Sequence, residues 1–382
     1  MHQHKLRIFG RSNIAIVAFV LLTTAEALHA AGHFDAFVDP SYTSSIYTSP
    51  LQTGEGGGIA WTTSSHMLTK FGSDIIEYNP TNNAIHNGTN VHTPLVTHSI
   101  SGLATNGVGI VNGTDGYIYS VGSAGLQRID PSNWAAPAVT LPGSVGGQGY
   151  GVNTLPNGKI VYSDGSNSSS VWVYDPVALT NTLIYSASFL VDDIETGPAG
   201  EIALAGQSNS SITILNSGGG LIKQFNTARF PDGLAFGAGP FANSIYANNN
   251  DGSITRYDMS AGWTGTVTPV DIATTLAGHH GYGDLASVGP DCAFYISTFP
   301  NVNFGHGNDA GIGTNWDNGV TNGEASIVRV GSSGIGADGL PNSDCVFYSL
   351  IETTIPEPGS AMILAIGMLP MLCRRRSHRM RL

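Results

Sequence analysis

Hydrophobic and polar positions alternate in short runs along most of the chain. One example is Val171-Trp172-Val173-Tyr174, which Asp175 ends. Such alternation is typical of a β-strand with one buried face. Asp115-Gly116 and Asn157-Gly158 separate neighbouring runs, and these pairs supply the positive φ of a tight hairpin. The pattern therefore predicts many short antiparallel strands, and with 50 glycines and only 11% charged residues it excludes a helical bundle.

The runs repeat at intervals of about 40 to 50 residues. Each unit begins with an apolar residue after a glycine or an acid, and these anchors are Ile59, Val108, Val152, Ile194, Leu234 and Leu285. The third run of each unit is the clearest, at residues 75–79, 126–130, 171–175, 211–216, 253–258 and 326–330. Four strands in each of six units predict an all-β fold, a six-bladed β-propeller over residues 32–352. A β-sandwich or a solenoid with the same turns is the alternative.

A propeller must close into a ring. We expect residues 34–38 to add a strand beside residues 345–348, the fourth run of the last unit, so that the first and last parts of the chain share a sheet. We also expect turns at Asn79-Pro80, Asp130-Pro131 and Asp175-Pro176, because Asn or Asp before proline favours a turn.

The N-terminus has the pattern of a secretory signal. Lys5, Arg7 and Arg11 precede an apolar run at residues 14–22, and Ala25-Glu26-Ala27 offers the small residues that a signal peptidase needs. Residues 1–27 are therefore predicted to be a signal peptide, with cleavage after Ala30 as the less regular option. An N-terminal membrane anchor is the alternative, although the run is shorter than the roughly 20 residues of a bilayer crossing.

The C-terminus contains Pro356-Glu357-Pro358, then an apolar stretch at residues 361–373, then Arg374, Arg375 and Arg376. This order resembles the PEP-CTERM sorting signal of bacterial surface proteins. The resemblance implies that residues 355–382 form a hydrophobic sorting helix, that an exosortase cuts near the Pro-Glu-Pro motif, and that the arginines stop the tail on the cytoplasmic side. The protein would then be exported to the bacterial cell envelope, cell surface or medium. A permanent C-terminal membrane anchor is the alternative.

Removing both ends changes the charge balance. Residues 32–355 contain seven basic and 25 acidic residues, a net formal charge of −18. This charge excludes nucleic acid as a partner, because phosphate binding needs a basic surface. Cations, neutral extracellular polysaccharides or surface proteins fit better.

The body of the chain contains two cysteines, Cys292 and Cys345, each followed after one residue by Phe-Tyr. In an oxidising compartment such a pair predicts one disulfide bond. Two buried free thiols are the alternative.

Pro231-Asp232-Gly233-Leu234-Ala235-Phe236-Gly237, with Ser244-Ile245-Tyr246 and Asp251-Gly252 after it, resembles repeats of the gluconolactonase, NHL and streptogramin-lyase superfamily of six-bladed propellers. Gluconolactonase-like relatives hold a divalent ion with a first-blade Glu and the Asp of the Pro-Asp-Gly motif. The resemblance therefore implies roles for Glu55 and Asp232. Glu55 is one residue out of register with the family's Glu-Gly-Pro pattern, and Asp192 stands where the family has Asn.

In a propeller the first strand of each blade lines the central channel, so acids just before the anchors are expected to meet at one opening. Oxygen ligands favour Ca²⁺ over a transition metal. Acids that cap strand ends in solvent are the alternative. The candidate ligands are Glu55, Asp192, Asp193, Asp232 and Asp284.

His280, in Gly278-His279-His280-Gly281 before the last unit, is the candidate general base for lactone opening or for lyase chemistry as in streptogramin lyase. A surface histidine pair is the alternative. The sequence has no phosphate-binding glycine loop and no Gly-x-Ser-x-Gly motif.

Three functions fit the sequence. The first is an exported binding module at the cell surface, the second is a calcium-dependent enzyme similar to a lactonase or a lyase, and the third is a structural component of an extracellular polysaccharide layer.

Overall fold

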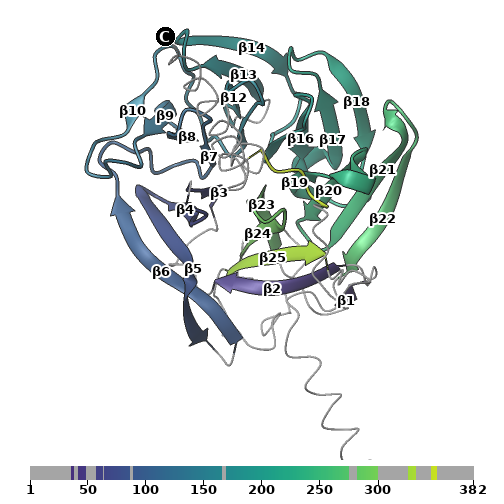
Figure 1. The fold of residues 1–382 in the computed structure, drawn as a ribbon. Helices are drawn as coiled ribbons and strands as arrows, with labels where there is room; N and C mark the ends of the chain where they lie inside the picture. Colours follow the sequence, from purple (N-terminus) through teal and green to yellow (C-terminus); the bar gives the residue numbers. More distant parts are fainter. Residues whose placement is uncertain are drawn as a thin grey trace, which may run out of the picture.

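The computed structural model describes residues 36–37, 42–48, 57–62, 64–86, 89–165, 169–274, 282–299, 326–332 and 346–350. These residues form six antiparallel sheets around a central axis (Figure 1). The first strands of successive sheets contact one another in the closed circuit β3, β7, β11, β15, β19, β23 and back to β3. The prediction of an all-β six-bladed propeller is confirmed, and the sandwich and solenoid alternatives are wrong.

The first four blades each have four strands, numbered outward from the channel. The first blade contains β3 (Ile59–Trp61), β4 (Met67–Phe71), β5 (Asp74–His86) and β6 (Thr89–Ser99). The second contains β7 (Ile110–Asn112), β8 (Ile118–Gly122), β9 (Gly125–Ile129) and β10 (Val139–Thr140). The third contains β11 (Val152–Thr154), β12 (Ile160–Ser163), β13 (Ser170–Asp175) and β14 (Thr180–Ser186).

The fourth blade contains β15 (Ile194–Thr196), β16 (Ile202–Gly206), β17 (Ser211–Leu215) and β18 (Leu221–Asn226). The fifth contains β19 (Pro231–Phe236), β20 (Ser244–Asn249), β21 (Ile254–Trp263) and β22 (Val267–Thr274), with β1 (Ala36–Phe37) at its outer edge. The sixth contains β23 (Tyr282–Val288), β24 (Phe294–Phe299), β25 (Ser326–Ser332) and β2 (Tyr42–Thr48). Two short 3₁₀ helices, η1 (Gln207–Asn209) and η2 (Gly239–Phe241), lie between strands.

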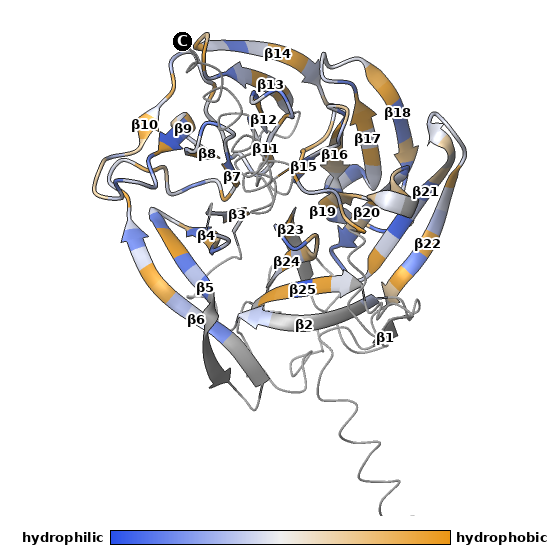
Figure 2. Ribbon diagram, viewed as in Figure 1, coloured by the Kyte–Doolittle hydropathy of each residue, from blue (hydrophilic) through white to orange (hydrophobic). Residues whose placement is uncertain are grey.

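The hydrophobic core lies between neighbouring blades. Ile194, Ile202 and Leu204 of the fourth blade pack in one buried cluster with Val161 and Val171 of the third. Figure 2 shows apolar and polar residues interspersed along the strands of the blades. Because each sheet buries its faces against the next, a blade depends on its neighbours for its core.

The predicted hairpins are confirmed. Gly116 and Gly158 have φ values of 84° and 81°, which glycine adopts without the steric penalty of a Cβ atom. The Asp130 and Asp175 side chains accept backbone amides in the turns that they open. The turn predicted at Asn79-Pro80 is wrong, because β5 continues to His86 and takes up the irregularity as a register shift between Tyr78 and Asn83.

Ring closure differs from the prediction. The short strand β1, within the predicted run 34–38, pairs with β22 of the fifth blade. The strand that closes the ring is β2, which the sequence analysis missed and which pairs antiparallel with β25 as the fourth strand of the sixth blade. Tyr42 and Tyr47 of β2 are buried, so this strand contributes to the core as well as to hydrogen bonding.

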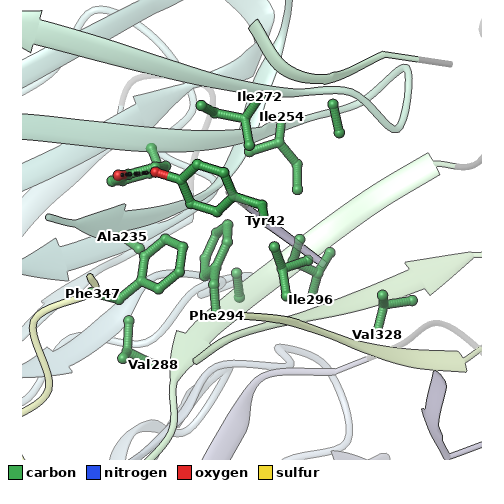
Figure 3. Close-up of a cluster of buried hydrophobic side chains, with 13 residues drawn as sticks. Tyr42, Ala235, Ile254, Ile272, Val288, Phe294, Ile296, Val328 and Phe347 are labelled. Atoms are coloured by element: carbon green, nitrogen blue, oxygen red, sulfur yellow. Dashed lines mark hydrogen bonds between the residues drawn. The ribbon is translucent and has the colours of Figure 1, made fainter. Parts of the chain in front are cut away.

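Residues 346–348 are not the fourth strand of the last blade, as was predicted from the run 345–348. They lie instead beside β19, where Phe347 forms an isolated antiparallel bridge with Gly237. The reason is that β2 already fills the outer edge of β25, whereas the channel edge of β19 is available for pairing. Figure 3 shows Phe347 in the cluster that also holds Tyr42 and Phe294.

The predicted signal peptide, residues 1–27, and the predicted sorting segment, residues 355–382, lie outside the described residues. The boundaries of both segments and of the 32–352 domain therefore stay predictions. In the part of the chain that the structure describes, no helix has the length and apolar character of a membrane span.

Candidate functional site in the central channel

The central channel has two distinct ends. Asp192 and Asp193 come just before β15, and Asp232 is the second residue of β19, so all three lie where a first strand begins. We call this end the acidic opening. The turns that follow the first strands, such as residues 197–201 after β15 and the segment after Phe236, lie at the other end, which we call the turn face.

The three acids are brought together by contacts between the fourth and fifth blades. Asp193 accepts the amide of Ile194 through Oδ1 at 2.9 Å and the amide of Leu234 through Oδ2 at 2.7 Å. Gln207 joins the other two, because its amide donates to Asp192 Oδ2 at 3.2 Å and its Nε2 donates to Asp232 Oδ2 at 2.9 Å. All three are buried, unlike the solvent-facing acids of the alternative.

Burial changes the protonation of this cluster. It raises the pKa of Asp192 to about 7, against the hydrogen bond from the Gln207 amide, which lowers it. Burial also raises the pKa of Asp193 to about 7, and the nearby Asp192 raises it further. The protonation state of these two carboxyl groups therefore changes near neutral pH, where an ordinary aspartate is fully ionised.

Glu195, which the sequence analysis did not single out, is a further buried acid of the channel wall. Its Oε2 accepts a hydrogen bond from Nδ2 of Asn153 at 2.8 Å. Burial raises the pKa of Glu195 well above the usual value, and the nearby Asp193 raises it further. The repeat could have identified it, because Glu195 and Asn153 occupy the same place, one residue after the anchor, in consecutive units.

A polar ladder joins the first strands below the acids. Thr154 Oγ1 donates to the Asn112 carbonyl at 2.6 Å, and Thr196 Oγ1 donates to the Thr154 carbonyl at 2.8 Å. The Asn112 side chain continues the ladder to Trp61 by bonding both its amide and its carbonyl. These bonds hold neighbouring blades in register along the channel.

Residues 346–350, which we call the channel segment, contribute to the wall of a cavity of about 60 Å³ in the channel. The cavity is lined by β3, β7, β11, β15 and β23 together with Tyr348, Ser349 and Leu350, and this volume holds about four water molecules. Ser349 Oγ and Trp61 Nε1, on residues only 4% and 3% exposed, have no hydrogen-bond partner among the described residues. Burial raises the pKa of Tyr348, as do the carboxylates of Glu195 and Glu201.

The described donors alone do not fit a calcium ion. Both oxygens of Asp193 accept backbone amides, and no group of three or more His, Cys, Asp or Glu side chains in the described part of the chain is arranged to hold a metal. Glu55 lies outside the described residues, and of Asp284 only the backbone, in β23, is described. The predicted calcium site therefore stays a prediction, as does the role of His280, which also lies outside the described residues.

Cys292 is disulfide-bonded, so the free-thiol alternative is wrong for this residue. It lies in the turn between β23 and β24, where its backbone has φ +56°. Its predicted partner, Cys345, lies outside the described residues, and the pairing stays a prediction.

Comparison with known proteins supports the fold. No protein-family model matches the sequence, and no curated protein matches it significantly. The PQQ-bound aldose sugar dehydrogenase from Streptomyces coelicolor is similar in structure, with a TM-score of 0.51 and 14% identity, over 78% of this chain and 100% of that chain. Virginiamycin B lyase from Staphylococcus aureus gives a TM-score of 0.44 and 16% identity, over 67% of this chain and 80% of that chain. At such identity the likeness to the dehydrogenase shows the propeller fold alone.

Proposed function

We propose that the chain is an exported propeller that acts as a binding module at the bacterial cell surface, where an exosortase-type enzyme processes its C-terminal tail. The observation that carries the proposal is the channel segment. The cavity that this segment lines has a volume of about 60 Å³, whereas pockets for small organic ligands measure roughly 300 to 1,000 Å³. The loops and the outer surface are then the parts that meet a ligand.

The outer surface has the chemistry for a neutral partner. The fourth strands β6, β10, β14 and β18 contain a single charged residue, Lys223, whose Nζ donates to the Gly265 carbonyl. Each of these strands also has an apolar side chain that is about half exposed, namely Leu95, Val139, Leu183 and Leu221. Uncharged apolar and hydroxyl groups on a strongly acidic body favour neutral glycans over polyanions.

Co-sedimentation tests the binding proposal. The full chain is mixed with an insoluble neutral glucan and, separately, with a polyuronate gel of equal mass. We expect retention on the glucan and less on the polyuronate, with the difference shrinking as salt screens the repulsion. The matched variants Leu183→Asp and Leu221→Asp should weaken retention, while Ala199→Ser at the turn face should not. If neither polymer retained the chain, a glycan-binding role would be contradicted.

A calcium-dependent enzyme similar to a lactonase or a lyase is the second candidate. It is favoured by one observation, the buried Asp192, Asp193 and Glu195 with raised pKa values, since such groups concentrate at catalytic sites. In this case calorimetry should detect one Ca²⁺ per chain, and Asp232→Ala or Asp193→Ala should abolish its binding. His280→Ala should then abolish lactone hydrolysis without changing Ca²⁺ binding. A chain that binds no Ca²⁺ and hydrolyses no lactone removes this candidate.

A further inference from the structure

The channel segment has a defined direction along the propeller axis. The Ala238 amide donates to the Val346 carbonyl at 2.9 Å, and the Tyr348 amide donates to the Phe236 carbonyl at 2.9 Å, on either side of the Gly237–Phe347 bridge. This pairing is antiparallel. Since β19 runs from Asp232 at the acidic opening to Phe236 near the turn face, residues 346–350 run the opposite way, from the turn face toward the acidic opening.

The segment is firmly held. Phe347 is 1% exposed, and its ring centroid lies 4.7 Å from that of Tyr246 and 5.5 Å from that of Phe294 (Figure 3). The ring centroid of Tyr42, in the closing strand, lies 6.4 Å from that of Phe347. Leu350, the last described residue, is therefore held at the wall of the channel cavity.

The length of the remaining chain limits how far the propeller can lie from a membrane. In the register of the Gly237–Phe347 bridge, Leu350 is level with Leu234, so two further residues are enough to reach the level of Asp232. Residues 353–360 then precede the apolar stretch 361–373. Eight residues span at most about 29 Å when fully extended, which is larger than the screening length of about 8 Å at physiological salt.

We propose that the uncut tail tethers the propeller with its acidic opening toward the lipid bilayer and its turn face toward the outside. This inference rests on the proposed function, because it takes the apolar tail as a membrane tether. The bilayer is then the surface that the acidic opening meets before processing, and ligands from outside meet the fourth strands. Cutting the tail removes this restriction and makes the acidic opening accessible.

Two variants, each with one added cysteine in the same blade, test the orientation. Ser208→Cys lies in η1, next to Gln207 at the acidic opening, and Ala199→Cys lies in the turn between β15 and β16 at the turn face. Both positions are exposed, and the five-residue strand β16, about 16 Å long, separates them. Ser188→Cys and Gly218→Cys, also exposed, provide a second pair at the same two ends.

The full-length variants are recovered in membrane vesicles with the propeller on the accessible side and treated with a bulky polyethylene-glycol maleimide, after subtraction of labelling in the parent chain. We expect Ser208→Cys to react several-fold more slowly than Ala199→Cys, and the two rates to converge in detergent. Equal rates in vesicles, or slower labelling of Ala199→Cys, would overturn the orientation while leaving the membrane tether intact. Recovery of the parent chain only in the soluble fraction would overturn both the orientation and the tether.

Discussion

At the scale of single residues, the channel acids act first as structural groups. Asp193 holds the start of β15 and the amide of Leu234 together, so one side chain joins the fourth and fifth blades. Glu195 meets the Asn153 amide in the same wall. A buried carboxyl group that accepts these bonds avoids much of the cost of desolvation by remaining protonated.

Raised carboxyl pKa values predict that the protein loses stability as the pH rises. Between the unfolded value of about 3.9 and the folded value of about 7, the unfolded chain gives up its protons while Asp192 and Asp193 in the folded chain keep theirs. The contribution of these two groups to the free energy of unfolding is fully present below about pH 4 and is lost as the pH rises through 7. Thermal unfolding at pH 5 should therefore occur several degrees above that at pH 8.

The variant Glu195→Gln tests whether the pH dependence of stability comes from burial of this carboxyl group or from repulsion among all the negative charges. The variant should match the parent at pH 4, where both side chains are neutral, and be more stable at pH 8. Asp130→Asn is the control, because Ser132 lowers the pKa of this exposed carboxyl, so its loss should destabilise slightly or have no effect. Equal stabilisation by both variants at pH 8 would indicate that net charge, not burial of Glu195, causes the pH dependence.

At the scale of elements, closure of the ring depends on contacts that β2 makes within the sixth blade and with the fifth and first blades. Its backbone pairs with β25, while its Tyr42 hydroxyl lies 2.7 Å from the Tyr246 hydroxyl in the fifth blade. Arg256 Nη1 also donates to the Tyr42 hydroxyl, and its guanidinium pairs with Asp258. The strand thus links the fifth and sixth blades through side chains as well as through the sheet.

Tyr42→Phe should lower the free energy of unfolding by about 1 to 3 kcal/mol, because the Tyr246 hydroxyl loses a partner in a buried setting. Urea unfolding at constant m-value measures this loss. Tyr185→Phe, on the half-buried outer strand β14, is the matched control and should change the midpoint little. Similar effects of the two variants would contradict the role assigned to Tyr42.

The repeat predicted most of the fold because each blade buries an alternating apolar face, as in Val171 to Tyr174, and such alternation is visible in the sequence. Ring closure was not predictable in the same way. The polar run Thr43-Ser44-Ser45 in β2 has no apolar alternation, and it pairs because the edge of β25 is available. The run 345–348 has the pattern of a strand, yet the sequence does not show that Phe347 pairs with Gly237, because this pairing depends on which strand edges remain unpaired.

The candidate site could also be predicted only in part. Asp192, Asp193 and Asp232 were found because they precede or begin first strands, and the structure brings them together. Tyr348 and Ser349 were missed because they reach the cavity from a segment more than 110 residues beyond β19 in sequence. Contacts of this kind depend on the tertiary path of the chain and not on any local pattern.

At the scale of the whole molecule, the disulfide of Cys292 connects the sixth blade to a distant part of the chain. If Cys345 is its partner, as predicted, the bond fixes the residue just before the channel segment. The double variant Cys292→Ser/Cys345→Ser should then lose about 4 kcal/mol of stability, the chain-entropy value for a loop of roughly 50 residues. Peptide mapping without reduction identifies the partner directly, and a bond from Cys292 to Cys373 would contradict the prediction.

The position of β2 also determines when the protein can finish folding. A strand from near the start of the chain completes a sheet whose other members end at Ser332, so synthesis must be almost complete before the last gap in the ring is filled. Pairing over such a sequence separation is slow, because the entropy of closing the loop is lost before any contact forms. The ring therefore stays open until the chain has been made as far as β25. The unpaired edge of β25 is exposed to other chains throughout that interval.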